Sequence, residues 1–203
     1  MGLGRVEASG GFFLLLAWMN YLDRQCLVPM ALLACLLHEL GHYLAITWLG
    51  GGVKLIRLTA VGAEMVLDRP LGYWQEGVAA LAGPGVNLAL ALLFCALPGG
   101  AVFSGLNLVL ACFNMLPVGR LDGGRALSCT LSLLLGPDWA WRVGRGLDVA
   151  FGALLLLLGG AALFGGENPT LLLVALWVVA GITREKTGGK RRNGACHPGE
   201  KRV

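Results

Sequence analysis

Hydrophobic residues gather into long runs along this chain, with short polar segments between them. A helix that crosses a bilayer needs roughly 20 apolar residues. Four runs approach or reach that length: residues 27–49, 78–97, 101–116 and 149–164. Two shorter runs are weaker candidates: residues 11–22 and 170–182. This pattern predicts an all-α polytopic membrane protein with about six transmembrane helices, or four if the two weaker runs do not cross.

The composition supports the same class of protein. Hydrophobic residues make up 56% of the 203 residues and charged residues only 14%, where soluble domains have roughly 25% charged residues. A soluble domain of this size could not bury so much apolar surface and keep a charged, hydrated shell. The composition therefore argues against a soluble domain, a disordered chain and a nucleic-acid-binding protein. The lipid bilayer is the expected partner of the apolar surface.

The distribution of positive charge predicts the orientation in the membrane, because cytoplasmic loops carry an excess of Lys and Arg. If six helices cross and the N-terminus is cytoplasmic, all of the 16 Lys and Arg except Arg24 fall on the cytoplasmic side. We therefore expect a multi-pass protein of the cell membrane with both termini in the cytoplasm. Residues 1–183 would form the transmembrane domain, and the basic residues 184–203 a disordered cytoplasmic tail.

The first long cytoplasmic loop, residues 50–76, contains two stretches with β-like composition. They cover residues 53–58 and 61–67. Gly62 lies at the start of the second stretch, where it could form the turn of a hairpin. The sequence predicts a short cytoplasmic β-hairpin here.

The second long cytoplasmic loop covers residues 119–146. We expect a short amphipathic or interfacial helix near residues 125–135. Trp139 and Trp141 follow it, and a tryptophan pair beside an apolar run is typical of a membrane-interface anchor.

A motif of charged and polar residues lies inside the apolar run 27–49. Residues 38–42 read His-Glu-Leu-Gly-His. Two histidines at positions i and i+4 share one face of a helix, so both imidazoles can reach one metal ion with Glu39 beside it. Two His ligands and a glutamate general base are the zincin arrangement. A pair of buried structural histidines is the alternative, but ionisable residues in a spanning helix usually mark a functional site.

A catalytic zinc takes a third protein ligand, and several residues could supply it. The third histidine, His197, lies in the tail. The candidates in or beside the apolar runs are three carboxylates and the cysteines, which form no CxxC pair and are more simply explained as apolar filler. The three carboxylates are those of Asp122, Asp148 and Glu76.

Asp122 is the preferred candidate, because two glycines follow it directly and Pro117 ends the run before it. These features let the backbone turn sharply and aim the carboxylate back toward the membrane. The alternative is that Asp122 caps a helix that starts near Arg125. Asp148 has a simpler explanation, an ion pair with Arg145 three residues before it.

A third motif, Ala-Gly-Pro-Gly-Val-Asn at residues 82–87, lies in the apolar run 78–97. Small residues let helices pack closely in lipid, and Asn87 is expected to hydrogen-bond across helices. Helix packing is the favoured role of this motif, and a direct catalytic role for Asn87 is the alternative.

In this order, HELGH at 38–42, AGPGVN at 82–87 and NMLPVGRLDGG at 114–124 resemble the site-2 protease family of intramembrane zinc metalloproteases. The layout of the apolar runs most resembles the stage IV sporulation protein FB branch, which cleaves a membrane-associated pro-sigma factor. The resemblance implies that His38, His42 and Asp122 bind Zn²⁺ and that Glu39 is the catalytic acid–base. It also implies that Asn114 positions the substrate or stabilises the oxyanion, with Asn87 as a further candidate for that role.

The expected activity is therefore that of a zinc-dependent intramembrane endopeptidase. Its partners would be a membrane-spanning or membrane-associated protein substrate and a regulatory membrane protein. The substrate would bind in extended form, and residues 53–67 could pair with it by strand addition. Two other functions stay open: a catalytically silent pseudoprotease that binds membrane proteins, and a multi-pass metal transporter. The presence of Glu39 argues against the first, and the gathering of polar residues in one place argues against the second.

Overall fold

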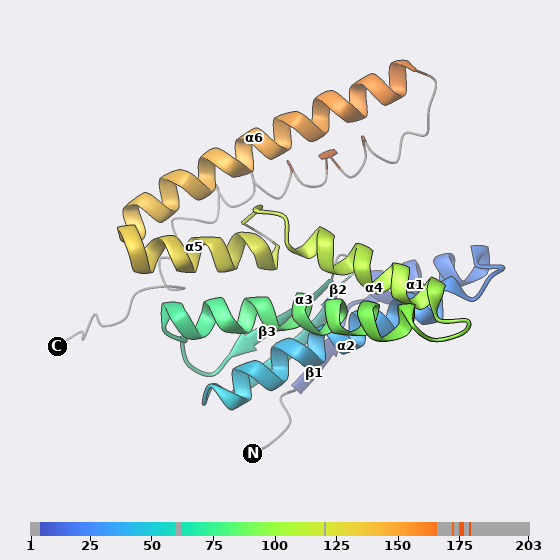
Figure 1. Ribbon diagram of the computed structural model, residues 1–203, viewed down its shortest axis with the longest axis horizontal. Coiled ribbons are helices and arrows are strands. Elements are labelled where there is room, and N and C mark those ends of the chain that lie inside the picture. The colour runs from blue at the N-terminus through green and yellow to red at the C-terminus, as the bar shows by residue number, and fades with distance from the viewer. Residues whose placement is uncertain are drawn as a thin grey trace. The chain divides into compact units, whose positions relative to one another are not determined.

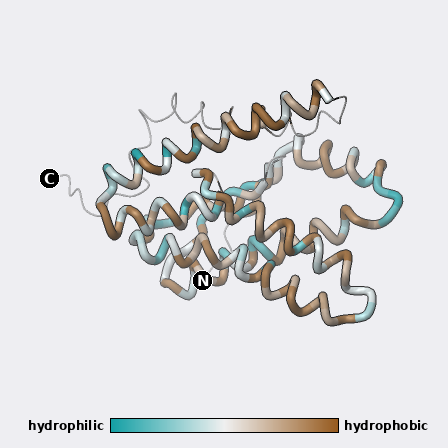
Figure 2. The backbone as a smooth tube through the Cα atoms, turned by 45° about the horizontal axis from the view of Figure 1, so that its top comes forward, coloured by the Kyte–Doolittle hydropathy of each residue, from teal (hydrophilic) through white to brown (hydrophobic). Residues whose placement is uncertain are grey.

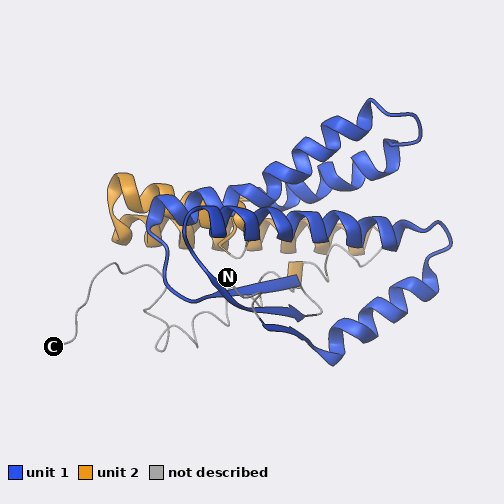
Figure 3. Ribbon diagram, turned by 90° about the horizontal axis from the view of Figure 1, so that it is seen from below, with its two compact units in different colours: residues 1–115 blue, residues 116–203 orange. Residues whose placement is uncertain are grey.

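The computed structural model describes residues 5–59, 62–119, 121–165, 172, 175, 176 and 179. This part of the chain holds six helices and three strands (Figure 1). The chain divides into two compact units, Met1–Met115 and Leu116–Val203, which Figure 3 shows in different colours.

The first unit contains the helices that follow four of the predicted apolar runs. They are α1 (Gly10–Leu22), α2 (Leu27–Trp48), α3 (Tyr73–Cys95) and α4 (Ala101–Asn114). Helix α3 packs along both α2 and α4. The residues buried between these helices are mostly small, among them Ala34, Gly41, Ala80, Ala91 and Ala111. Small side chains let the helix backbones approach closely, as expected for helices that pack in lipid.

A short turn after α1 holds the beginning of α2. The carboxylate of Asp23 accepts hydrogen bonds from the amides of Val28, at 2.8 Å, and Gln25, at 3.0 Å. The bond from Val28 is the main reason that the pKa of Asp23 lies below its usual value. Asp23 thus satisfies one of the amides that the first turn of a helix leaves without a helical partner.

A mixed three-stranded sheet completes the first unit. Its strands β1 (Arg5–Ala8), β2 (Val53–Thr59) and β3 (Gly62–Leu67) lie in the order β1-β2-β3. Strand β2 pairs antiparallel with β3 and parallel with β1. Gly62 pairs with Thr59 at the end of the hairpin and has a φ of +134°, which a residue with a side chain rarely adopts.

The hairpin predicted from residues 53–67 is confirmed, and the described part of the chain is otherwise mostly helical, as the sequence predicts. The sheet has a third strand, β1, that the sequence analysis did not predict. Strand β1 is only four residues long, and each of its residues pairs with one fifty positions further along the chain. So short a stretch has no clear period of its own, and its strand structure depends on this distant partner.

The second unit contains α5 (Asp122–Leu135) and α6 (Pro137–Phe164), which pack against each other. The predicted loop 119–146 is therefore mostly helical. Helix α6 begins at Pro137, well before the apolar run that starts at residue 149, because proline is favoured at the first position of a helix. In its first turns, Arg142 lies 5.6 Å from the ring centre of Trp139 and Arg145 lies 5.1 Å from that of Trp141. This arrangement suits the predicted role of both tryptophans at a membrane interface.

Three of the described helices, α2, α3 and α6, are long and apolar enough to cross a membrane. The helices α1 and α4 match predicted runs but have only 13 and 14 residues, or roughly 20 Å at ~1.5 Å per residue, against a bilayer core of about 30 Å. Hydrophobic residues predominate along most of the described helices (Figure 2), and many of their large apolar side chains are exposed. The predicted run 170–182 lies almost entirely outside the described residues, and the tail 184–203 lies wholly outside them.

Candidate metal centre

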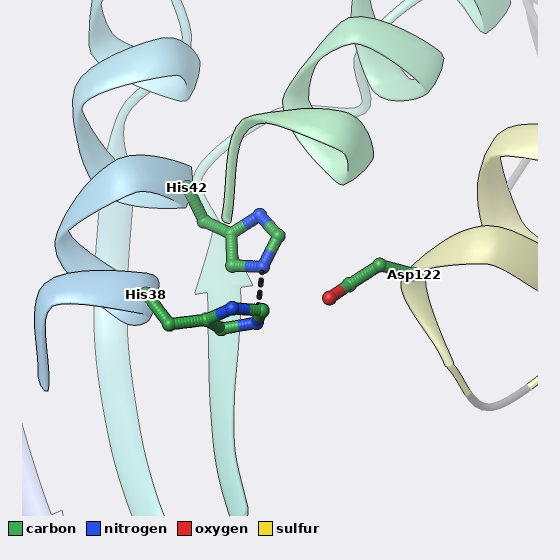
Figure 4. Close-up of side chains that lie close together, drawn as sticks. All are labelled: His38, His42 and Asp122. Carbon is green, nitrogen blue, oxygen red and sulfur yellow. Dashed lines mark hydrogen bonds between the residues drawn. The ribbon is translucent and has the colours of Figure 1, made fainter. Parts of the chain in front are cut away.

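The two histidines of the HELGH motif lie side by side on α2. Both side chains are buried, and their Nε2 atoms are 3.1 Å apart (Figure 4). Four residues make slightly more than one helical turn, so the two rings emerge from one face of α2, as the spacing predicts. Glu39 follows His38 on the same helix and is half-buried.

Each imidazole is held through its other nitrogen by a group on α3. The Nδ1 of His38 lies 2.5 Å from the Oδ1 of Asn87, and the Nδ1 of His42 lies 2.7 Å from the carbonyl oxygen of Ala79. Both partners are acceptors, so each Nδ1 carries the proton and donates it. In the neutral ring the Nε2 is then the unprotonated nitrogen, which is the form that binds a metal.

The geometry of this pair fits a zinc ion. Zinc binds imidazole nitrogen at about 2.0–2.1 Å, so two ligands of a tetrahedral ion lie roughly 3.3–3.4 Å apart. The observed separation of 3.1 Å between the Nε2 atoms is close to this value. Two unprotonated nitrogens that face each other at this distance repel unless a cation or a proton lies between them. The donor set and its spacing therefore suit Zn²⁺.

Gly83 leaves space for the His42 ring, and Gly41 lets the backbones of α2 and α3 approach closely. A Cβ on Gly83 of α3 would lie 2.3 Å from the Nε2 of His42 and 2.6 Å from its Cε1. A Cβ on Gly41 of α2 would lie 2.9 Å from the carbonyl oxygen of Ala82. The Ala-Gly-Pro-Gly-Val-Asn segment thus does more than pack, because Gly83 provides the volume that the His42 ring occupies.

Asn87 hydrogen-bonds across helices, as the sequence analysis predicts. Its side chain is fully buried. Its Nδ2 donates to the carbonyl oxygen of Ala34 on α2, at 3.2 Å, and to the Oδ1 of Asn107 on α4, at 2.7 Å. Its Oδ1 contacts His38. The Asn87 amide thus has three hydrogen-bonding partners, Ala34, Asn107 and His38, all within the first unit.

Asn107 is a polar residue of this region that the sequence analysis did not single out. It is as fully buried as Asn87. Its Nδ2 donates to the carbonyl oxygen of Phe103, one turn earlier on α4, at 2.8 Å. The signal was present in the sequence, since an asparagine within an uncharged apolar run needs a polar partner in a membrane.

Asp122 belongs to the second unit and is the first residue of α5 (Figure 4). The N-cap of this helix is Leu121, so the alternative that Asp122 caps a helix starting near Arg125 is wrong. A carboxylate in the first turn is still favoured by the helix dipole, and Nη1 of Arg125 lies 4.0 Å from Oδ1 of Asp122. The segment before α5 comes very close to the helix at Gly124. A Cβ at this position would lie 2.0 Å from the carbonyl oxygen of Val118, so only glycine fits there.

Asp148 has a different partner from the one expected. Its Oδ1 accepts a hydrogen bond from the amide of Gly119, at 2.7 Å. Arg145 packs over Trp141 instead, and among the described residues no ion pair joins Arg145 to Asp148. Asp148 therefore ties α6 to the segment that precedes α5, a role that residue spacing along a single helix could not reveal.

The other residues that the sequence offers as site candidates are Asn114, Glu76, the cysteines and His197. Asn114 is the last residue of α4, half-buried, and its Nδ2 donates to the carbonyl oxygen of Leu110 at 3.0 Å. Glu76 lies in the first turn of α3. The cysteines among the described residues form no disulfide. His197 lies outside the described residues.

Comparison with known proteins adds independent information. No family model matches the chain. A Synechocystis protein provisionally named a zinc metalloprotease is 36% identical over 140 residues, which are 59% of this chain and 37% of that protein. A zinc metalloprotease of Methanocaldococcus jannaschii is 28% identical over 162 residues, 73% of this chain and 46% of that protein. The matches thus span less than half the length of these curated relatives.

Among solved structures, the site-2 protease from Methanocaldococcus jannaschii superposes with a TM-score of 0.67 and 23% identity. The match covers 97% of this chain and 94% of that chain. The chain has the fold of this site-2 protease. Because the two sequences are only 23% identical, this likeness shows a shared fold and no more.

Proposed function

We propose that the chain is a zinc-dependent endopeptidase of the site-2 protease family that works within a membrane. The observation that carries this proposal is the arrangement of His38 and His42. Their Nε2 atoms lie 3.1 Å apart on α2, a helix long and apolar enough to cross a membrane, and each Nδ1 is anchored to α3. The names of the curated relatives and the shared fold support the same activity.

His38, His42 and Asp122 would hold the zinc ion. Two histidines and one carboxylate are a known ligand set for catalytic zinc, and the fourth position is left for water or substrate. Asp122 is supported by its position in the Leu-Asp-Gly-Gly segment and by the close approach of backbone at Gly124. Its role as the third ligand is part of the proposal.

Glu39 would act as the general base and acid of peptide hydrolysis. Zinc, when bound, supplies Lewis acidity that acidifies water and polarises a carbonyl group. The Glu39 carboxylate would take a proton from the attacking water and return it to the amide nitrogen as the peptide C–N bond breaks. Asn114 would contact the substrate or its developing oxyanion by donating a hydrogen bond from its amide.

The helices around the site support a substrate that is embedded in the membrane or tethered to it. The helices α2 and α3 expose large apolar side chains, which suit lipid, so a protein that reaches the site would itself lie in or beside the membrane. The scissile segment would have to be extended, since a helix keeps its amides in its own hydrogen bonds. The outer edges of β1 and β3 could pair with such a segment, whereas β2 is paired on both sides.

We place the protein in the cell membrane as a multi-pass protein with both termini in the cytoplasm. A membrane-associated pro-sigma factor is the first substrate to test, because the layout of the apolar runs resembles the sporulation branch of the family. A regulatory membrane protein is a further expected partner.

Co-expression with a panel of membrane-tethered substrates tests this function. The panel would include a membrane-associated pro-sigma factor, and each substrate would have a matched version without its membrane segment. We expect the wild type to release a shorter product from at least one tethered substrate, and His42→Ala to release none. Zinc transport into vesicles without any cleavage would favour the metal-transporter alternative instead.

A further inference from the structure

We propose that Asn87 and Asn107 are positioning residues that fix the tautomer and ring orientation of His38. The inference rests on the proposed function, because it concerns the readiness of His38 to bind zinc. It assigns Asn87 a role different from direct contact with the substrate. It also assigns a role to Asn107, which lies on a helix that carries no metal ligand.

The two amides form a chain of hydrogen bonds with only one consistent direction. The Nδ2 of Asn107 faces the carbonyl oxygen of Phe103, which can only accept, so this amide must present its Oδ1 to Asn87. The Nδ2 of Asn87 in turn faces two acceptors, that Oδ1 and the carbonyl oxygen of Ala34. Asn87 must therefore turn its Oδ1 toward His38.

The direction of this chain determines the protonation of the His38 ring. An amide oxygen only accepts, so the Nδ1 of His38, 2.5 Å away, must carry the proton. The unprotonated nitrogen of the neutral ring is then Nε2, which faces the Nε2 of His42. Hydrogen bonds of this kind to the second nitrogen of a histidine orient metal ligands in general.

The two histidines differ in how they are anchored. The ring of His42 donates to the backbone carbonyl of Ala79, which the fold of α3 supplies whatever the side chain is. The ring of His38 depends on side chains. Substitutions of the side chains that hold the His38 ring can therefore change its orientation while the helix backbone stays the same.

Substitutions at position 87 separate this role from simple packing. In Asn87→Asp the carboxylate still accepts from Nδ1 of His38, whereas Asn87→Leu removes this acceptor. We expect Asn87→Leu to weaken zinc binding by about 10–100-fold, the usual effect of removing such a partner, and Asn87→Asp to weaken it by less than about tenfold. A packing role predicts the opposite order, because leucine suits an apolar interior and a buried carboxylate does not.

Position 107 gives a second, independent pair. Asn107→Asp keeps an oxygen that accepts from Nδ2 of Asn87, and Asn107→Leu removes it. We expect Asn107→Leu to lower zinc affinity more than Asn107→Asp. The matched control is Ser104→Ala, because Ser104 is buried on the same helix and donates to the carbonyl oxygen of Ala91 on α3, at 2.7 Å, outside this chain of hydrogen bonds. This control should bind zinc as the wild type does.

A spectroscopic measurement on the zinc-free protein tests the tautomer itself. With ¹⁵N-labelled histidine, the shifts of His38 should show a protonated Nδ1 in the wild type, in Ser104→Ala and in Asn87→Asp. Asn87→Leu should show a mixture of tautomers, since the amide oxygen that accepts the Nδ1 proton is removed. A purely structural role for Asn87 would not move this signal in a protein of unchanged helix content.

The outcomes distinguish this inference from the proposed function. If the wild type binds zinc through its histidines but Asn87→Leu binds as tightly as Asn87→Asp, the positioning role is wrong and the proposed function stands. If the leucine variant at 87 does not fold, the order of the two variants at 107 decides in the same way. A wild type that binds no zinc overturns the proposed function and this inference with it.

Discussion

The volume that Gly83 leaves for the His42 ring can be tested by filling it. In Gly83→Ala the new Cβ would lie 2.3 Å from Nε2, 2.6 Å from Cε1 and 2.8 Å from Cδ2 of His42. Ordinary contacts of a Cβ begin near 3.4 Å, so the ring or α3 must move by about 1 Å, well beyond the tolerance of about 0.2 Å for a metal–ligand distance. The same movement strains the hydrogen bond from His42 to Ala79, which is 2.7 Å long.

We therefore expect Gly83→Ala to bind zinc about 10–100-fold more weakly and to lose about 100-fold in cleavage rate, the effect of a 1 Å misplacement in an active site. Gly85→Ala is the matched control. It lies two residues further along α3, and a Cβ there meets no atom within 4 Å. Both substitutions raise helix propensity by about 1 kcal/mol, so neither should unfold α3 through its backbone.

The assay is zinc per protein after titration of the purified protein in detergent, together with the helix content of each variant. Gly85→Ala should match the wild type in both. Wild-type zinc affinity in Gly83→Ala would refute the reasoning, because it would mean that His42 does not bind metal from the position that the structure gives it.

Three further predictions concern the second unit and the topology. Asp122→Ala should lose zinc binding and cleavage together, and full zinc occupancy in this variant would move the search for the third ligand to Asp148 or Glu76. Asp148→Ala removes the acceptor of the Gly119 amide and should lower the free energy of unfolding by about 1 kcal/mol, which chemical denaturation measures. Metal analysis should show that this variant keeps more zinc than Asp122→Ala. A reporter fused after Leu49 should read as cytoplasmic, since the following segment is basic, and activity on the opposite side would contradict the topology.

The parts of the site that depend on local spacing could be predicted from the sequence. His38 and His42 face one point because four residues make about one helical turn. The hairpin of β2 and β3 likewise needs only neighbouring residues and Gly62. In both cases the interacting groups are close along the chain, so the sequence pattern contains nearly all of the required information.

Features that depend on distant partners could not be predicted in this way. Strand β1 exists through its parallel pairing with β2. Asn107 contacts Asn87 because α3 and α4 pack against each other. The partner of Asp148 was expected on its own helix, yet it is the amide of Gly119, 29 residues earlier. Each of these contacts depends on how elements pack, which residue types alone do not specify.

The central claim is that this chain hydrolyses peptide bonds with Glu39 as the base at a zinc site. The most direct measurement compares the wild type with Glu39→Gln, reconstituted in vesicles with a tethered substrate and matched for bound zinc. We expect both proteins to hold one zinc ion each, because His38 and His42 are unchanged, and only the wild type to release product. Cleavage by Glu39→Gln at the wild-type rate would contradict the account.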